Sequence, residues 1–122
     1  MKKRPRINRW TQSRRDLIFS SSIKSSLVQP HFVVAGEGRD EEINSMPGVN
    51  RQSVDVLMET IAKDMENGIS SHMLFGVVDH HEKDSLASKA SDLEMPLQIA
   101  VSKLKEEYGN DIVLMTDVCL CT

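Results

Sequence analysis

The chain has 122 residues and a net charge of −3 at pH 7, with 39% hydrophobic and 27% charged residues. These values are typical of a soluble globular chain with at most one domain. No apolar run approaches the ~20 residues that a membrane-spanning helix needs, so we expect no membrane segment. The basic start lacks the apolar stretch of a signal peptide, so we expect no export.

Residues 1–28 form a predicted basic N-terminal arm. The first fifteen residues include Lys2, Lys3 and five arginines but no acidic residue. Such a segment can be a solvated tail, a nucleic-acid contact or an arm that wraps a partner subunit. Trp10 is its only aromatic residue, which gives little support to the stacking of several bases.

Three short apolar runs predict buried parallel strands over residues 31–35, 73–78 and 112–115. Their apolar residues are continuous rather than alternating, as a sheet buried on both faces requires. Each run is followed by polar or glycine-rich residues. We therefore expect a strand to end at each of these points.

Two amphipathic helices are predicted between the strands. Apolar residues from Val54 to Met65 recur at helical spacing, with Ser53 placed to cap the N-terminus and Gly68 to end the helix. A second stripe runs from Leu93 to Tyr108, and Pro96 fits only in its first turn.

The element order predicts an α/β fold built from right-handed βαβ units over residues 29–122. Successive crossovers of this kind place both helices on one face, which leaves parts of Val33, Leu74 and Val113 exposed on the other. That geometry suits the N-terminal part of a (β/α)8 TIM barrel, which needs ~250 residues. The prediction is an incomplete barrel with three strands and two helices.

The best candidate site follows the third predicted strand, because sites in these folds lie at the carboxyl ends of strands. Cys119 and Cys121 can place two thiolates on one side of an extended segment, which suits zinc. Asp117 lies two residues before them. Buried cysteines without a metal are the alternative. Their close spacing predicts no disulfide framework, which favours a reducing compartment.

Other histidines and acids are weaker candidates. The segment from Asp79 to Glu82 resembles metal-binding chemistry, but adjacent side chains diverge, so a polar loop is favoured. His31 and His72 stand at the starts of apolar runs, away from the expected site. We interpret both as structural.

Several motifs, in order along the chain, resemble the porphobilinogen synthase (delta-aminolevulinic acid dehydratase) family. The segment 117–121, Asp-Val-Cys-Leu-Cys, resembles that family's zinc-binding segment, and residues 45–48, Ser-Met-Pro-Gly, resemble the loop after its first strand. Arg4-Pro5-Arg6 and residues 74–77, Leu-Phe-Gly-Val, match as well. Val78, Ala87 and Ser91 depart from the pattern, which usually has proline, glycine and an aromatic residue there.

The resemblance implies a barrel enzyme, a hydro-lyase that condenses two 5-aminolevulinate molecules into porphobilinogen with loss of two waters, in heme and other tetrapyrrole synthesis. It implies zinc held by Cys119, Cys121 and a third cysteine beyond this chain, with Asp117 in proton transfer or in ordering zinc-bound water. The two Schiff-base lysines have no match among the lysines here, so we expect the 122-residue chain to be an inactive fragment. Whether a magnesium site exists is left open.

The resemblance also implies a homo-octamer in which the arm embraces a neighbouring subunit, with no nucleic-acid partner. We expect a cytoplasmic location, or the stroma of a plastid or other organelle in a eukaryote. The alternative of another class is a small stand-alone metal-binding or regulatory α/β module with a basic arm.

Overall fold

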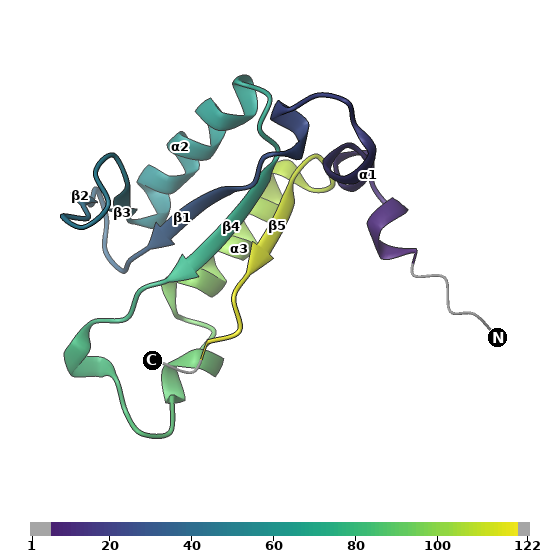
Figure 1. The fold of residues 1–122 in the computed structure, drawn as a ribbon. Coiled ribbons are helices and arrows are strands. Elements are labelled where there is room, and N and C mark those ends of the chain that lie inside the picture. The colour runs from purple at the N-terminus through teal and green to yellow at the C-terminus, as the bar shows by residue number, and fades with distance from the viewer. Residues whose placement is uncertain (1–5, 120–122) are drawn as a thin grey trace.

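Three parallel strands form the centre of the fold, as the apolar runs predict (Figure 1). The computed structural model describes residues 6–119. The strands are β1 (Gln29–Val33), β4 (Ser71–Gly76) and β5 (Val113–Thr116), and β4 lies between the other two. The first two begin two residues earlier than their apolar runs, because pairing between strands extends into polar residues.

Two further strands were not predicted. β2 (Asp40–Glu42) pairs antiparallel with β3 (Asn50–Gln52), and β3 adds to the free edge of β1 in parallel. The sheet therefore has five strands in the order β2-β3-β1-β4-β5. These short strands are made of polar residues, so no apolar pattern marks them in the sequence.

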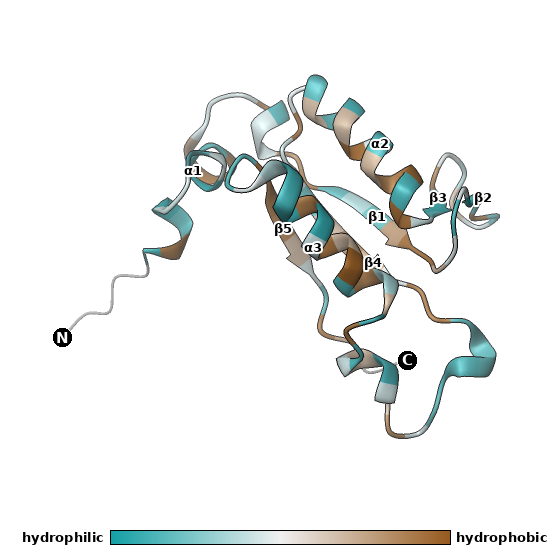
Figure 2. Cartoon of the chain, turned by 180° about the vertical axis from the view of Figure 1, so that it is seen from behind, coloured by the Kyte–Doolittle hydropathy of each residue, from teal (hydrophilic) through white to brown (hydrophobic). Residues whose placement is uncertain are grey.

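Helices α2 (Val54–Glu66) and α3 (Pro96–Tyr108) pack on the same side of the sheet, as the βαβ order predicts. Figure 2 views the molecule from this side, with α3 in front of the strands and α2 next to β1. Together with the strands they enclose one core cluster of buried residues: Val33, Val54, Leu57, Ile61, Leu74, Ala100, Leu104 and Ile112. Among the described residues, no helix is long and apolar enough to cross a membrane.

The helices begin where the sequence predicts, but the predicted capping contact of Ser53 does not form. Ser53 precedes α2, yet its hydroxyl accepts a hydrogen bond from the Arg39 backbone N–H at 2.9 Å instead of capping the helix. Pro96 is the first residue of α3. Leu93, expected on the apolar stripe of this helix, lies before it and is 78% exposed.

The face opposite the helices carries Phe32, Met73 and Phe75, each half-buried. The Phe32 and Phe75 rings stack with centroids 5.3 Å apart. The expectation of one face without helices is confirmed, but its residues were wrongly assigned. Val33 and Leu74 are fully buried on the helix side, because side chains alternate along a strand.

The arm is more structured than a solvated tail. It contains α1 (Gln12–Phe19) and the 3-10 helices η1 (Ile7–Arg9) and η2 (Lys24–Ser26). Ser13 in α1 is buried, and its hydroxyl donates to the Asn110 carbonyl oxygen at 2.7 Å. This bond connects the arm to the turn that precedes β5.

Candidate functional site

A cavity opens at the carboxyl ends of β4 and β5, where sites in parallel sheets are expected. Its volume is about 780 Å³. The walls come from the ends of the strands, the segment after β4 and the first turns of α3. They include Phe32, Phe75, Gly76, Val77, Val78, Lys83, Lys89, Ala90, Leu93, Met95, Pro96, Leu97, Gln98, Val101, Ser102, Thr116, Asp117, Val118 and Cys119.

Two of the three predicted site residues lie at this cavity. Asp117 and Cys119 follow β5 directly, are half-buried, and line the cavity. Val118 between them is 99% exposed, because side chains alternate along an extended segment. The third residue, Cys121, lies outside the described residues.

The sulfur of Cys119 is disulfide-bonded in this structure. The close spacing of the cysteines in the sequence predicted no disulfide framework, so a bonded Cys119 was not expected. Zinc is bound by thiolates, so Cys119 becomes a ligand only after reduction. Its sulfur chemistry fits zinc, but the described residues bring no set of three ligands together around it.

The segment between β4 and α3 forms one wall through two 3-10 helices, η3 (His80–Glu82) and η4 (Ser88–Ser91). Asp84 orders it, because its Oδ1 accepts hydrogen bonds from the backbone N–H groups of Leu86 at 2.9 Å and Ser88 at 3.1 Å. The hydrogen bond from the Ser88 backbone N–H makes the largest contribution to lowering the pKa of the Asp84 carboxyl.

Lys83 and Lys89 line the cavity, and Lys89 forms ion pairs there. The Lys89 Nζ lies 3.7 Å from the Glu82 Oε1 and 3.8 Å from the Asp92 Oδ2. These ion pairs hold η3 and η4 together at the cavity wall.

The polar segment after β4 is exposed, as predicted. Asp79, His81 and Glu82 nevertheless place one ligand atom each within 4.8 Å of one another, a proximity that sequence spacing did not indicate. All three side chains are solvent-exposed. Exposed groups of this kind are ordinary on protein surfaces, so they do not define a site.

Residues 36–48, which connect β1 to β3 and include β2, do not line the cavity. Arg39 organises this loop by donating to the Ala35 carbonyl oxygen and to both carboxylate oxygens of Glu41. That hydrogen bonding lowers the pKa of the Glu41 carboxyl. The prediction from the sequence missed the aromatic pair Phe32 and Phe75 at the cavity. Each is adjacent in sequence to a core residue, Val33 or Leu74, and the alternation of side chains along a strand indicates that the pair lies on the opposite face.

The chain matches the family model described as delta-aminolevulinic acid dehydratase over residues 2–122. The enzyme of that name from Methanothermobacter thermautotrophicus is 43% identical over 99 residues, which are 80% of this chain and 29% of the relative. The Mycobacterium tuberculosis relative is 36% identical over 120 residues, which are 98% of this chain and 36% of that protein. The chain thus spans about a third of the curated relatives it matches.

A solved structure matches as well. It is delta-aminolevulinic acid dehydratase (porphobilinogen synthase) from Toxoplasma gondii ME49, in complex with the reaction product porphobilinogen. The TM-score is 0.75 at 34% sequence identity, and the match covers 98% of this chain and 34% of that one.

Proposed function

Since this chain belongs to the delta-aminolevulinic acid dehydratase family, we propose that it forms the first strands of a porphobilinogen-forming TIM barrel. The barrel condenses two molecules of 5-aminolevulinate into porphobilinogen with loss of two waters. The family match favours this enzyme over a stand-alone regulatory or metal-binding module.

One observation carries the proposal. Asp117 and Cys119 lie together at a cavity on the carboxyl edge of a parallel sheet. Their segment is the one that resembles the zinc-binding segment of the family. The match to a solved barrel with porphobilinogen bound supports a small-molecule substrate at this edge.

Cys119 and Cys121 would hold the zinc, with a third cysteine supplied from outside this chain. Bound zinc supplies a Lewis acid that polarises a substrate oxygen. Asp117 lines the same cavity, and its carboxylate is proposed to hold or move a proton there. Phe32 and Phe75 give the cavity an apolar wall that excludes water and strengthens electrostatic contacts inside it.

The lysines that form Schiff bases with the substrate are implied by the resemblance to lie outside this chain. None of Lys83, Lys89, Lys103 and Lys105 matches their positions in that resemblance. The chain alone is therefore proposed to bind metal without forming product.

The arm supports an additional proposal about assembly. Several of its apolar side chains are exposed: Ile7 57%, Trp10 78%, Phe19 61% and Ile23 80%. Apolar side chains gathered on one segment suit contact with another subunit. We propose that the arm embraces a neighbouring copy in a homo-octamer. The proposed location is the cytoplasm, or a plastid or other organelle stroma.

The zinc assignment is tested on the reduced chain with Co²⁺, which gives a near-ultraviolet charge-transfer band only when sulfur is a ligand. We expect this band in the wild-type chain and its loss in Cys119→Ser and in Cys121→Ser. Val118→Ser is the matched control, because it changes the same segment at a fully exposed position without removing sulfur. Metal binding to the reduced chain without any sulfur band contradicts the assignment.

A further inference from the structure

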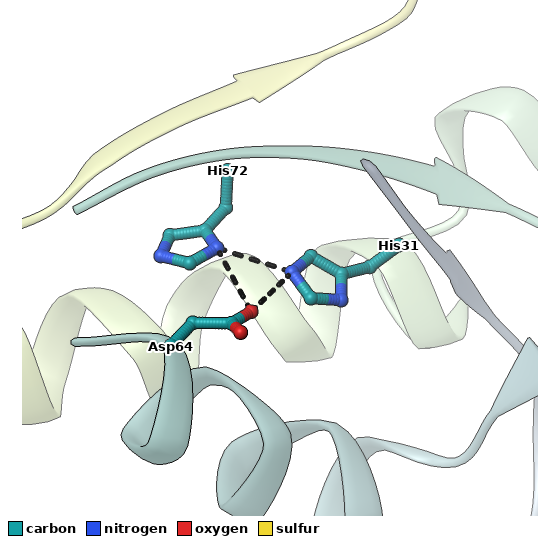
Figure 3. Close-up of side chains that lie close together, drawn as sticks. All are labelled: His31, Asp64 and His72. Carbon is teal, nitrogen blue, oxygen red and sulfur yellow. Dashed lines mark hydrogen bonds and ion pairs between the residues drawn. The ribbon is translucent and has the colours of Figure 1, made fainter. Parts of the chain in front are cut away.

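A second group of potential metal ligands lies at the opposite end of the sheet (Figure 3). His31 comes from β1 and His72 from the neighbouring β4, and both rings are buried, with 5% and 0% of their surface exposed. Asp64 lies in the last turn of α2. This helix runs back across the sheet, so its C-terminal end lies over the amino-terminal halves of the strands.

The backbone directs all three side chains to one point. His31 precedes Val33 by two residues, and His72 precedes Leu74 by two, so both rings lie on the helix-covered side with these core residues. Figure 3 shows the three side chains converging between the sheet and α2. The ring centroids are 5.2 Å apart.

The spacing of the three ligand atoms fits a tetrahedral ion. The His31 Nε2 lies 3.1 Å from the His72 Nδ1 and 3.5 Å from the Asp64 Oδ2, and the His72 Nδ1 lies 3.9 Å from that same oxygen. Ligand atoms about 2.1 Å from a zinc-like ion are separated from one another by about 3.4 Å in a tetrahedral site. The three observed distances lie on both sides of this value, so an ion fits between the ligand atoms without any rearrangement of the backbone.

The hydrogen bonding of the three side chains also favours a cation. The His31 Nε2 and the His72 Nδ1 share a hydrogen bond, and both lie within 4 Å of the Asp64 Oδ2. That oxygen is buried and has no hydrogen-bond partner among the described residues. A buried carboxylate oxygen without a partner is costly, and a bound metal ion would offset that cost.

We propose that His31, Asp64 and His72 bind a divalent transition-metal ion of the zinc class, at a site separate from Cys119 and Cys121. Two imidazoles and one carboxylate suit zinc, cobalt, nickel or ferrous iron, whereas magnesium and calcium prefer oxygen ligands. The side chain of Asp64 is 22% exposed, which leaves a route for the ion and a position for a water ligand. The ion would join α2 to β1 and β4 and so stabilise the fold.

The test uses the full chain carrying Cys119→Ser and Cys121→Ser, so that sulfur cannot contribute. Zinc affinity is measured by competition with a chromophoric chelator, and the visible spectrum of bound Co²⁺ reports the geometry. We expect one equivalent of metal, a four-coordinate Co²⁺ spectrum without a sulfur band, and a rise in melting temperature with added zinc. An excess of Mg²⁺ should not displace the ion.

Three variants remove one ligand each. His31→Gln and His72→Asn place an amide near the lost ring nitrogen, and Asp64→Asn keeps the shape of the carboxylate. Each should weaken zinc binding by at least tenfold and abolish the rise in melting temperature. His81→Gln, on the exposed η3, is the matched histidine control and should change neither quantity.

Circular dichroism checks that each variant is folded before metal is added. Asp64→Asn keeps the test decisive if a buried histidine variant fails to fold, because Asp64 is partly exposed. Zinc binding that survives Asp64→Asn unchanged, or no zinc binding at micromolar concentrations in the folded parent chain, overturns the proposal. Neither result bears on the cysteine site, which is absent from this background.

Discussion

Gly76 is the residue on which the packing of α3 against β4 depends. A Cβ added at this position would lie 3.0 Å from the Leu97 Cβ and 3.4 Å from its Cδ2. The nearest of these atoms is attached directly to the backbone of α3, so it cannot rotate away. The contact therefore sets how closely the helix approaches the end of the strand beside the cavity.

We expect Gly76→Ala to lower the free energy of unfolding by about 1–3 kcal/mol, because the added methyl overpacks this contact. Urea denaturation followed by circular dichroism measures the change. In a Leu97→Ala background the same substitution should cost clearly less, since the clashing side chain is gone. An equal cost in both backgrounds would show that contact with Leu97 is not the cause.

For the two buried histidines, the sequence predicted part of what the structure shows. His31 and His72 were correctly predicted to lie away from the cavity, and their structural role was the favoured interpretation. Their convergence with Asp64 was not predicted, because it depends on the register of β1 against β4 and on where α2 crosses the sheet. Neither quantity is carried by the local pattern of residues.

At the scale of elements, helices and central strands were predictable because each has a periodic apolar pattern. Both helices end beside a glycine. Gly68 lies one residue beyond the C-terminal cap of α2, and Gly109 is itself the C-terminal cap of α3. β2 and β3 were missed because their stability comes from pairing with β1 rather than from apolar residues. The boundaries of the arm and barrel segments, 1–28 and 29–122, remain predictions.

The segment between β4 and α3 contains one strained residue. Ala87 has φ of +51°, and it is the non-glycine residue with positive φ in the described part of the chain. The family that this sequence resembles usually has glycine at that position. An alanine in this conformation costs roughly 1–2 kcal/mol relative to glycine.

We expect Ala87→Gly to raise the free energy of unfolding by about 0.5–1 kcal/mol, because relief of strain exceeds the added entropy of the unfolded chain. Thermal and urea unfolding measure the change. Ala90→Gly in η4 is the matched control, since Ala90 has an ordinary backbone conformation, and it should be destabilising. If both substitutions destabilise the chain alike, the strain at Ala87 has no energetic consequence.

At the scale of the whole molecule, the sheet is covered by helices on one side and carries half-buried aromatic residues on the other. In a closed barrel that second face lies inside and is filled by further strands. The sequence indicated this arrangement through the βαβ order. It could not assign the faces correctly, because continuous apolar strands do not show which residues face the helices.

We propose that this chain supplies the metal-binding edge of a porphobilinogen-forming barrel. The most direct measurement is porphobilinogen formation by a chimera in which these 122 residues replace the matching part of the Methanothermobacter thermautotrophicus relative, which is 43% identical to this chain over 99 residues. The rest of that protein would supply the Schiff-base lysines and the third cysteine that the resemblance implies.

We predict that the zinc-loaded chimera converts 5-aminolevulinate into porphobilinogen, and that Cys119→Ala together with Cys121→Ala reduces the rate by at least a hundredfold while circular dichroism stays unchanged. A folded, zinc-loaded chimera that forms no product, or one whose rate is unaffected by loss of both cysteines, would contradict the account.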